Sequence, residues 1–412
     1  MTREEHYDKI LELSRENNYL LLKLPTSFGK CKISIDLIKE YSKETFLYQV
    51  LIVVPKLVLI DNWKAELIKW EIPNNVEVTF TTYLSLHKHA DIPWEMIIFD
   101  ETHHFTENCA EIMADYMYKR VICMSATIPK EQRWRIKDVF NGIKEYSVTA
   151  RNAIEDSILP DPKVLLIPIM LDNVHISQTY IKNKSKSGVP VRVYYGSRRS
   201  VAGIKNKPVH ILCTEQEYYN EISSMIDWWK QRYMAAGEVY MKNNWLRLAK
   251  DRLNWLSERK NTFTKSLIET LKDYRVLTFC ASIAQTEELG KYCINSKNKE
   301  SSTYLTMFNE GEINHITACG ILNEGANLTD CQIGIYASIG SSEIVEIQRL
   351  GRILRHENPL LIIPYFVGTR EEEIVNKMTR NYNADLIKTA FKSQVDESLI
   401  KEFLNGSTEN NN

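Results

Sequence analysis

The sequence lacks any paired cysteine motif. Its eight cysteines never stand at C-x-x-C spacing, and no histidine pair accompanies them at the spacing of a zinc site. We therefore expect reduced cysteines in core or site positions, which is typical of a cytoplasmic protein.

Long apolar runs are also missing. No stretch of about 18 apolar residues occurs, and the amino terminus from Met1 to Glu5 is charged rather than apolar. We expect no membrane span and no export, and therefore a cytoplasmic location. Residues 401–412 are predicted to be a flexible tail, because the chain from Asn405 is small and polar.

The chain carries almost no net charge, with a formal value of -1 over 412 residues. A protein that binds a polyanion over its whole surface would be strongly basic, so any contact with nucleic acid must come from a local basic stretch. The length predicts two or three domains, and a composition that is 44% hydrophobic and 25% charged is ordinary for a globular protein.

One such stretch contains no acidic residue, between Asp172 and Glu215. Its basic residues are Lys182, Lys184, Lys186, Arg192, Arg198, Arg199, Lys205 and Lys207, interleaved with Tyr180, Tyr194 and Tyr195. The alternation from Val191 to Tyr195 favours a strand. A hairpin or loop that binds nucleic acid through Arg192, Arg198, Arg199, Lys205 and Lys207 and a plain solvated basic loop both fit this composition.

Apolar runs alternate with amphipathic stretches in two parts of the chain, which is the pattern of parallel sheets covered by helices. In residues 1–150 the expected strands are Tyr19 to Leu24, Gln49 to Val54, Val76 to Phe80, Glu95 to Phe99 and Arg120 to Met124. In residues 275–400 they are Val276 to Phe279, His315 to Cys319, Gln332 to Tyr336 and Leu360 to Phe366. Asp61 is the expected N-cap of a helix that ends at Trp70. The sequence predicts two α/β units.

The segment between these units has a different character. Residues 151–172 form a crossover that contains a buried strand, Lys163 to Met170, and residues 173–274 form an insertion in which the basic stretch precedes helix-compatible sequence from Glu215 to Lys272. The tryptophans of that helical part are Trp228, Trp229, Trp245 and Trp255. We expect them to be core residues of a helical hairpin.

A candidate phosphate-binding loop follows the first strand. It comprises Leu24, Pro25, Thr26, Ser27, Phe28, Gly29, Lys30 and Cys31, and an amphipathic helix comes next. In this setting backbone N–H groups and the helix N-terminus point at phosphate oxygens while Lys30 reaches the β- and γ-phosphates. Taken alone, the segment also fits a strand-turn-helix junction that contains Gly-Lys by chance.

Two carboxylates, Asp100 and Glu101, end the buried strand of residues 96–99. Open α/β sheets bind ligands at the carboxyl ends of their strands, and Mg-ATP would offset the cost of burying two acids there. Asp100 would hold Mg²⁺, and Glu101 would orient or deprotonate the attacking water. An acidic strand end without a ligand is the alternative.

Two further segments complete the set. Ser125, Ala126 and Thr127 follow the next strand, and residues 348–355 read Gln-Arg-Leu-Gly-Arg-Ile-Leu-Arg. Helical spacing would place Arg352 and Arg355 on one face, where two guanidinium groups suit a phosphate. The alternative for this second segment is an exposed basic turn.

In order along the chain, these segments resemble the motifs of superfamily 2 helicases. Residues 24–31 resemble motif I, 51–56 motif Ia, 81–83 the Ib region, 100–103 a DEAH-type motif II, 125–127 motif III, 276–280 motif IV, 324–328 motif V and 348–355 motif VI. The resemblance implies two tandem RecA-like domains with a mainly helical insertion, and an ATP site shared between them. Its catalytic residues would be Lys30, Asp100, Glu101, Gln348, Arg352 and Arg355.

The same resemblance assigns the remaining roles. Gly325 would contact the nucleotide, Lys56 and Thr82 the nucleic acid, and Ser125 and Thr127 would couple the two sites. Three positions depart from the family pattern. Cys31 replaces a hydroxyl ligand of Mg²⁺, Ser27 replaces a glycine, and His6 stands where an adenine-reading glutamine is usual.

The sequence thus predicts an ATP- and Mg²⁺-dependent helicase or translocase, with DNA favoured over RNA. The Asp-Glu-Thr-His box and the helical insertion resemble phage and bacterial DNA helicases of the UvsW type, which implies replication, recombination or repair proteins as partners. Two alternatives remain at this stage: a clamp that binds nucleic acid without hydrolysis, and the motor subunit of a nuclease complex.

Overall fold

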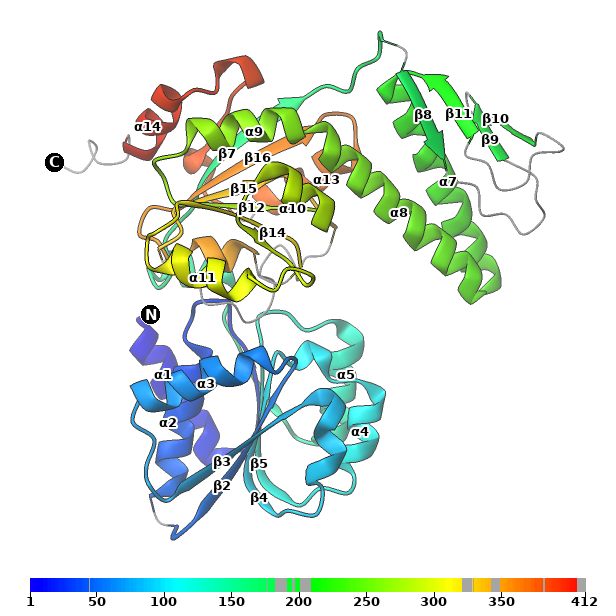
Figure 1. Cartoon of the computed structure of the whole chain (residues 1–412). Helices are drawn as coiled ribbons and strands as arrows, with labels where there is room; N and C mark the ends of the chain where they lie inside the picture. The colour runs from blue at the N-terminus through cyan, green and yellow to red at the C-terminus, as the bar shows by residue number, and fades with distance from the viewer. Residues whose placement is uncertain are drawn as a thin grey trace.

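A computed structural model of the chain describes residues 1–43, 45–175, 177–181, 191–194, 197–200, 209–320, 328, 330–341, 349–380 and 382–405. They form two α/β lobes and an insertion that projects from the second lobe (Figure 1). Every helix within this described part of the chain is too short or too polar to span a bilayer.

The first domain contains a six-stranded parallel sheet with the order β3-β2-β4-β5-β1-β6. Its strands are β1 (Tyr19–Lys23), β2 (Tyr48–Val54), β3 (Val76–Thr82), β4 (Trp94–Asp100), β5 (Tyr118–Ser125) and β6 (Lys144–Ser147). The inner strands β2 and β4 contain the unbroken apolar runs 50–54 and 96–99, as expected of strands that helices cover on both faces. Since all strands run the same way, their carboxyl ends share one edge of the sheet.

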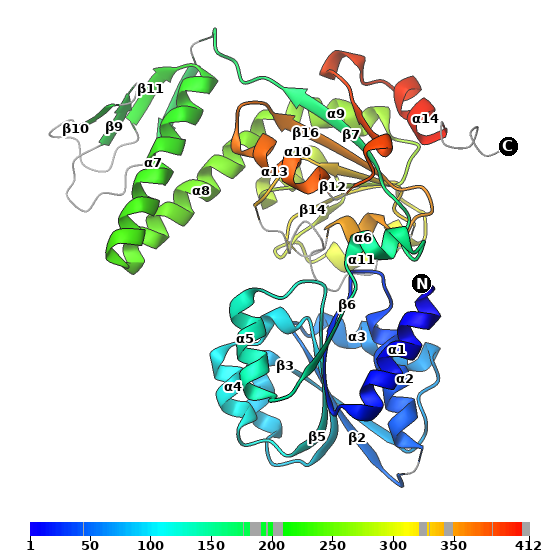
Figure 2. The same ribbon diagram turned by 180° about the vertical axis from the view of Figure 1, so that it is seen from behind.

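Helices pack on both faces of this sheet (Figures 1 and 2). One face carries α1 (Arg3–Glu16), α2 (Lys30–Ser42) and α3 (Val58–Lys69), and the other carries α4 (Glu107–Met113) and α5 (Lys130–Val139). The prediction of Asp61 as an N-cap is wrong, because α3 begins three residues earlier and buries Leu59 in the core. Asp61 instead lies in the first turn, where a carboxylate favours the helix dipole.

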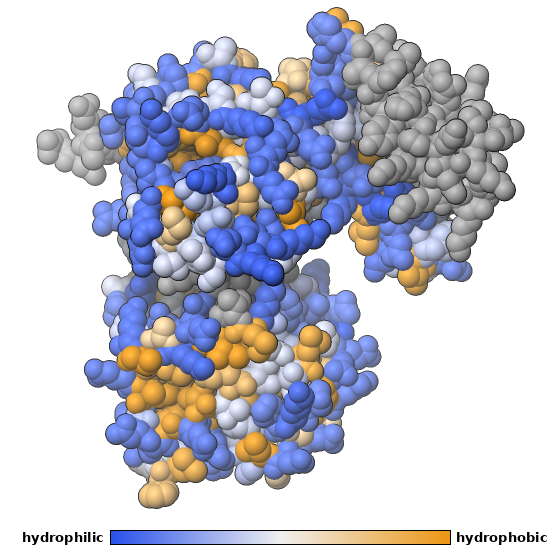
Figure 3. Space-filling view, in the orientation of Figure 1, coloured by the Kyte–Doolittle hydropathy of each residue, from blue (hydrophilic) through white to orange (hydrophobic). Residues whose placement is uncertain are grey.

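Some apolar side chains of the first domain remain at the surface. Leu57 and Ile68, at the two ends of α3, are 70% and 79% exposed. Apolar side chains gather over this part of the lower lobe in the space-filling view (Figure 3). The core therefore does not account for every apolar residue of α3.

The second domain contains a seven-stranded parallel sheet with the order β13-β14-β12-β15-β16-β7-β17. Its strands are β7 (Lys163–Ile169), β12 (Val276–Phe279), β13 (Cys293–Ile294), β14 (His315–Ala318), β15 (Ile333–Tyr336), β16 (Leu360–Phe366) and β17 (Ile387–Thr389). Its helices include α9 (Asn261–Thr270), α10 (Ile283–Leu289), α11 (Ser301–Asn309), α13 (Arg370–Thr379) and α14 (Glu397–Asn405). The predicted fold class, two tandem RecA-like α/β domains, is confirmed.

The chain enters the second sheet before it leaves for the insertion. A connection with the short helix α6 (Ala150–Glu155) leads to β7, which pairs with β16 and β17. The insertion then contains two antiparallel strand pairs and a pair of long helices. These elements are β8 (Ser177–Ile181) with β11 (Val209–Cys213), β9 (Val191–Tyr194) with β10 (Ser197–Ser200), α7 (Glu215–Ala236) and α8 (Val239–Arg259).

Helices α7 and α8 form the helical hairpin expected from the sequence, with Gly237 in the left-handed conformation between them. Trp255 is buried in its core. Trp228, Trp229 and Trp245 lie farther along the hairpin and are only half-buried. Their rings therefore remain partly accessible.

A buried ion pair joins this hairpin to the second domain. Lys260, at the junction of α8 and α9, lies 2.7 Å from Glu371 of α13 and is fully buried. Burial lowers the pKa of Lys260, and Glu371 opposes that shift. Since a charge buried here needs its partner, the pair fixes the point at which the chain returns from the insertion to the domain.

Candidate active site

The phosphate loop lies between β1 and α2 and is held in shape from α1. The Tyr7 hydroxyl shares its one proton between the carbonyl oxygens of Phe28 (3.1 Å) and Gly29 (3.2 Å). Burial raises the pKa of Tyr7 to about 12, so it stays a neutral donor. Gly29 has a φ of 103°, and a Cβ there would lie 2.0 Å from the Tyr7 oxygen, so only glycine fits.

Ser27 also adopts a left-handed conformation, with a φ of 67°. The helicase pattern has glycine here because a left-handed φ costs a side chain of L configuration free energy. The loop therefore keeps its shape despite the serine. The strain is offset by contacts across the domain boundary, described below.

Asp100 lies at the carboxyl end of β4 with both carboxylate oxygens hydrogen-bonded. Trp63 Nε1 donates to Oδ2 (2.9 Å), and the backbone N–H of Glu101 donates to Oδ1 (3.0 Å). Burial raises the pKa of Asp100, and the neighbouring Glu101 raises it further. An arriving divalent cation would favour the ionised form, so the position fits a ligand of Mg²⁺.

Glu101 has a left-handed backbone with a φ of 49°. Its carboxylate lies 3.7 Å from Lys30 Nζ, 3.1 Å from Ser125 Oγ and 3.4 Å from His103 Nδ1. Burial alone would raise the pKa of Glu101, but Lys30 and His103 outweigh it and hold that pKa below the ordinary value. Glu101 is therefore an ionised, well-oriented carboxylate.

The Cys31 thiol fits a metal ligand poorly. Burial raises the pKa of Cys31 well above its ordinary value, and Asp100 adds to that effect. The group is therefore a neutral thiol, and a neutral soft donor binds a hard cation weakly. Of the two metal ligands predicted from the sequence, only Asp100 has the chemistry to hold Mg²⁺.

The second domain meets the phosphate loop directly. The Ser27 hydroxyl donates to the Gly351 carbonyl oxygen (2.9 Å), and Arg355 Nε donates to Ser27 Oγ (3.3 Å). A Cβ on Gly351 would lie 2.2 Å from Thr26 Cβ, so the backbones approach too closely for any side chain there. The two halves of the site are therefore in contact.

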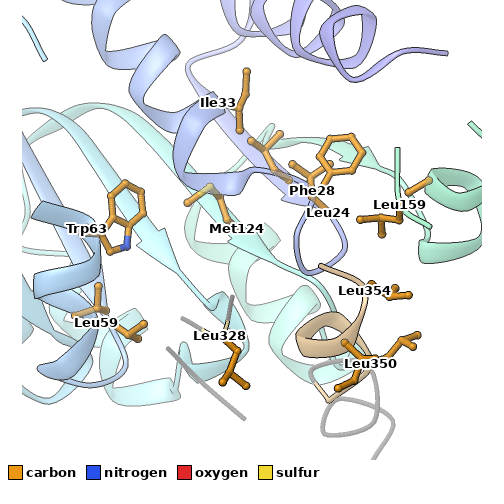
Figure 4. Close-up of a cluster of buried hydrophobic side chains, with 14 of the residues drawn as sticks. Leu24, Phe28, Ile33, Leu59, Trp63, Met124, Leu159, Leu328, Leu350 and Leu354 are labelled. Atoms are coloured by element: carbon orange, nitrogen blue, oxygen red, sulfur yellow. The ribbon is translucent and has the colours of Figure 1, made fainter. Parts of the chain in front are cut away.

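Apolar side chains seal the same boundary (Figure 4). Leu350 and Leu354 of the second domain belong to one buried cluster with Leu24 and Phe28 of the first, and Leu159 of the connection joins them. The helix that carries Leu350 ends at residue 353, and Arg355 follows it in a turn. Arg352 is only 6% exposed.

Both ring nitrogens of His6 lie within hydrogen-bonding distance of other side chains. Its Nδ1 lies 2.6 Å from the Tyr146 hydroxyl and its Nε2 lies 3.2 Å from Asp156. The ring also packs edge-on against Phe28. His6 thus joins α1 to β6, to the connection between the domains and to the phosphate loop.

The remaining sequence-predicted residues are distributed as follows. Lys56 follows β2 and Thr82 ends β3, on the same sheet edge as Asp100, and the Ser125 hydroxyl donates to the Thr127 carbonyl oxygen (2.8 Å). Arg192, Arg198 and Arg199 lie on β9 and β10. Gln348, Gly325, Lys205 and Lys207 lie outside the described residues, as do positions 406–412 of the predicted tail. Residues 401–405 of that predicted tail are instead the end of α14, because Leu404 packs into the core.

Sequence reasoning missed Tyr7 and Trp63. Each contacts the site through a hydrogen bond to a residue more than twenty positions away in the sequence, and neither belongs to a motif. The sequence contains only a weak signal for Trp63. It lies on the helix that follows β2, and the carboxyl end of β2 is at the same sheet edge as Asp100.

We expect Trp63→Phe to preserve the packing of α3 but to remove a hydrogen-bond donor from Asp100. The pKa of Asp100 would rise further. Because Asp100 binds Mg²⁺ only when it is ionised, the variant would lose activity at a higher pH than the parent enzyme as the pH is lowered. The acid limb of the ATPase profile should therefore move to higher pH, and kcat near neutrality should fall roughly tenfold. The control is Trp70→Phe, on the same stretch of chain. If the acid limb lies at the same pH in both variants and in the parent enzyme, the proposed role of Trp63 is contradicted.

We expect Cys31→Thr to increase hydrolysis at limiting Mg²⁺. The hydroxyl supplies a hard oxygen ligand, and about 1.4 kcal/mol of added coordination would lower the Mg²⁺ concentration at half-maximal rate roughly tenfold. Steady-state ATPase rates over a Mg²⁺ titration measure this, with Cys319→Thr on the second domain as the control. A rate that stays the same or falls would contradict the interpretation of Cys31.

Comparison with known proteins agrees with this geometry. Residues 2–130 match the family described as the type III restriction enzyme, res subunit, and residues 259–357 match the helicase conserved C-terminal domain. The DNA 3′-5′ translocase XPB2 of Sulfurisphaera tokodaii is 21% identical over 386 residues, which cover 88% of this chain and 79% of that protein.

Two solved structures share the fold. S. cerevisiae Dbp5 bound to RNA and ADP BeF3 has a TM-score of 0.59 at 8% identity, covering 94% of this chain and 89% of that one. The ATP-dependent Type ISP restriction-modification enzyme LlaBIII bound to DNA has a TM-score of 0.57 at 12% identity, covering 98% and 32%. These two likenesses concern the fold. The two family matches and the translocase relative support a superfamily 2 helicase. The chain is an ATP-hydrolysing enzyme of the helicase type.

Proposed function

We propose that this enzyme is an ATP-driven DNA translocase or helicase that acts in replication, recombination or repair. The observation that carries the proposal is the contact of both half-sites at the phosphate loop, where Ser27 binds Gly351 and Arg355 while Lys30 faces Glu101. The similarity to a DNA translocase favours DNA over RNA. The Asp-Glu-Thr-His box favours kinship with DNA helicases of the UvsW type.

In this mechanism Lys30 and the loop N–H groups bind the phosphates of ATP. Lys30 then leaves Glu101, whose ionised carboxylate orients the attacking water and accepts its proton. Mg²⁺, held by Asp100 together with the phosphates, would neutralise charge on the transferred group. Arg352 and Arg355 stabilise the charge that develops on the γ-phosphate, which makes hydrolysis depend on contact between the domains.

Ser125 is suited to couple this site to DNA. Its hydroxyl contacts Glu101, His103 and Thr127 at the end of β5. Lys56 and Thr82 lie at the ends of β2 and β3 on the same edge, where we place the DNA backbone. A shift at the end of β5 would therefore reach Glu101 through one hydroxyl, whereas β2, which Lys56 follows, pairs directly with the strand of Asp100.

The insertion supplies a second surface for DNA. Strands β9 and β10 carry Arg192, Arg198 and Arg199, and the helical hairpin offers aromatic rings together with cations: Arg232 stacks 4.2 Å from the centre of the Trp228 ring. Such pairs bind both phosphates and bases of single strands. Motion of the insertion with the second domain would then move the bound DNA.

One ATPase assay tests the proposal. Single-stranded, duplex and forked DNA and RNA of equal length are compared as activators, and we expect at least one form of DNA to raise the rate above that reached with RNA. Equal stimulation by all four, or by none, would contradict a DNA motor. The form that activates best identifies the substrate.

The basic stretch predicts the salt dependence of binding. If Arg198, Arg199, Lys205 and Lys207 contact phosphates, replacing all four with serine should flatten the slope of log K against log salt by about three to four units, because each contact contributes roughly 0.9. Fluorescence anisotropy over a salt series measures it. The control replaces Lys43, Lys119, Lys265 and Lys401, four surface lysines that pair with acidic residues. An unchanged slope would mean that these four residues do not contact DNA phosphates.

A second candidate function is the motor subunit of a restriction or nuclease complex. The match to the res subunit family and the likeness to LlaBIII favour it. Under this alternative the same ATPase would serve a partner that cuts DNA. Cleavage that requires both ATP and a co-purified second chain would distinguish it from an independent helicase.

A further inference from the structure

A cavity of about 650 Å³ lies between the two domains beside the phosphate loop. Its walls are Arg3 at the start of α1, Ile154 and residues 157–161 of the connection, and residues 354–357 of the second domain. Ser27 belongs both to this wall and to the loop. A nucleotide whose phosphates lie on the loop therefore has its nucleoside within reach of the cavity.

Two residues that line this cavity each have a buried polar atom without a hydrogen-bond partner among the described residues. These atoms are Oδ1 of Asp161 and Nε of Arg3. The guanidinium of Arg3 is itself fixed, because Nη2 donates to the Ile158 carbonyl oxygen (3.1 Å). Burial raises the pKa of Asp161, and a hydrogen bond from Asn383 opposes that shift. A buried acceptor and a buried donor in one cavity call for a ligand with complementary groups.

His6 cannot supply the missing groups while the fold is intact. Both of its ring nitrogens are within hydrogen-bonding distance of Tyr146 and Asp156, and its side chain is almost fully buried. Asp156 is further held by the amino group of Met1, at 2.6 Å. The position at which helicases usually read the base is therefore used here to anchor the connection between the domains.

We propose that Asp161 is the residue that reads the base of the bound nucleotide, by accepting a hydrogen bond from an exocyclic amino group. Arg3 donates to the neighbouring ring nitrogen. Adenine presents this pattern of donor beside acceptor, whereas hypoxanthine and guanine present a carbonyl oxygen and an N–H at the same places. The residue that selects for adenine is thus Asp161 of the connection, assisted by Arg3, rather than His6 of α1. This inference rests on the proposed function of the same site.

The test compares ATP with inosine triphosphate, which differ only at the reading edge of the base. The parent enzyme should prefer ATP by about tenfold or more in kcat/KM, because the unmatched carbonyl would face a buried carboxylate. Asp161→Asn offers an amide that donates to this carbonyl, so the ratio should fall by about tenfold. Asp161→Ala should bring the ratio close to one.

The control is Glu357→Gln, which removes an exposed carboxylate from the same cavity and should leave the ratio unchanged. Affinities for ADP and inosine diphosphate, measured by calorimetry, separate base reading from catalysis. If the enzyme hydrolyses no nucleotide but Asp161→Asn still changes the ADP to inosine diphosphate preference, the proposed function fails and the inference holds. A preference that Asp161→Asn leaves unchanged, or equal losses with both bases, would overturn the inference.

Discussion

Glu101→Gln should lower DNA-stimulated ATP hydrolysis by about 10²- to 10⁴-fold, the range that a general base contributes. The amide keeps the size of the side chain but can neither attract the proton of the attacking water nor pair with Lys30. Lys30 and Asp100 are untouched, so nucleotide should still bind. Single-turnover hydrolysis and equilibrium binding of ATP, measured on the same preparation, separate the two effects.

Glu95→Gln is the matched control, because Glu95 lies on the same strand and pairs with Lys119 at 2.8 Å, away from the site. It should keep the rate of the parent enzyme. Since Lys30 and His103 hold the pKa of Glu101 below its ordinary value, Glu101 stays ionised down to acidic pH in the enzyme without nucleotide. Full activity of Glu101→Gln would refute the site.

The sequence was sufficient to predict which edge of the first sheet carries the catalytic residues, because the ends of buried strands can be recognised in the sequence. Asp100 follows a continuous apolar run, and such a run is a buried parallel strand with its ligands at the carboxyl end. Lys30 and Glu101, far apart in the chain, meet because β1 and β4 end at the same edge, on either side of β5. The order and chemistry of the motifs predicted one site for Lys30, Asp100 and Glu101, but not the contact between Lys30 and Glu101.

The elements that the sequence did not reveal are short or polar. The strand β6 reads Lys-Glu-Tyr-Ser, and β17 has three residues, so neither contains an apolar run. Each is an edge strand whose pairing is decided by the neighbouring strand rather than by its own composition. Tyr7 and Trp63 were missed for a related reason: their partners are set by packing in three dimensions.

The structure also explains how the phosphate loop tolerates its serine. Ser27 costs backbone strain that glycine would avoid, yet its hydroxyl donates to Gly351 and accepts from Arg355. A glycine would have no side chain for either bond. Serine at this position therefore makes the loop less flexible than glycine would, but it connects the two domains directly. This contact lies next to Arg352 and Arg355.

Arg352→Ala should reduce kcat by about 10³- to 10⁵-fold, the effect of an arginine that stabilises the transferred phosphoryl group. Arg352 is buried at the domain boundary, and burial together with Arg355 lowers its pKa to about 10, while Glu101 opposes that shift. The guanidinium thus stays charged at neutral pH in a setting of weak solvent screening, where its charge acts most strongly. The KM for ATP should change far less than kcat.

Arg352→Lys distinguishes charge from geometry. Lysine keeps the charge but has no planar fork for two phosphate oxygens, so its kcat should remain well below that of the parent enzyme. Arg370→Ala, which removes an exposed arginine from α13, is the control for loss of a cation from the second domain. Thermal unfolding of all three variants shows whether the fold survives. A loss in kcat below tenfold for a folded Arg352→Ala would mean that the second domain binds the nucleotide without taking part in its hydrolysis.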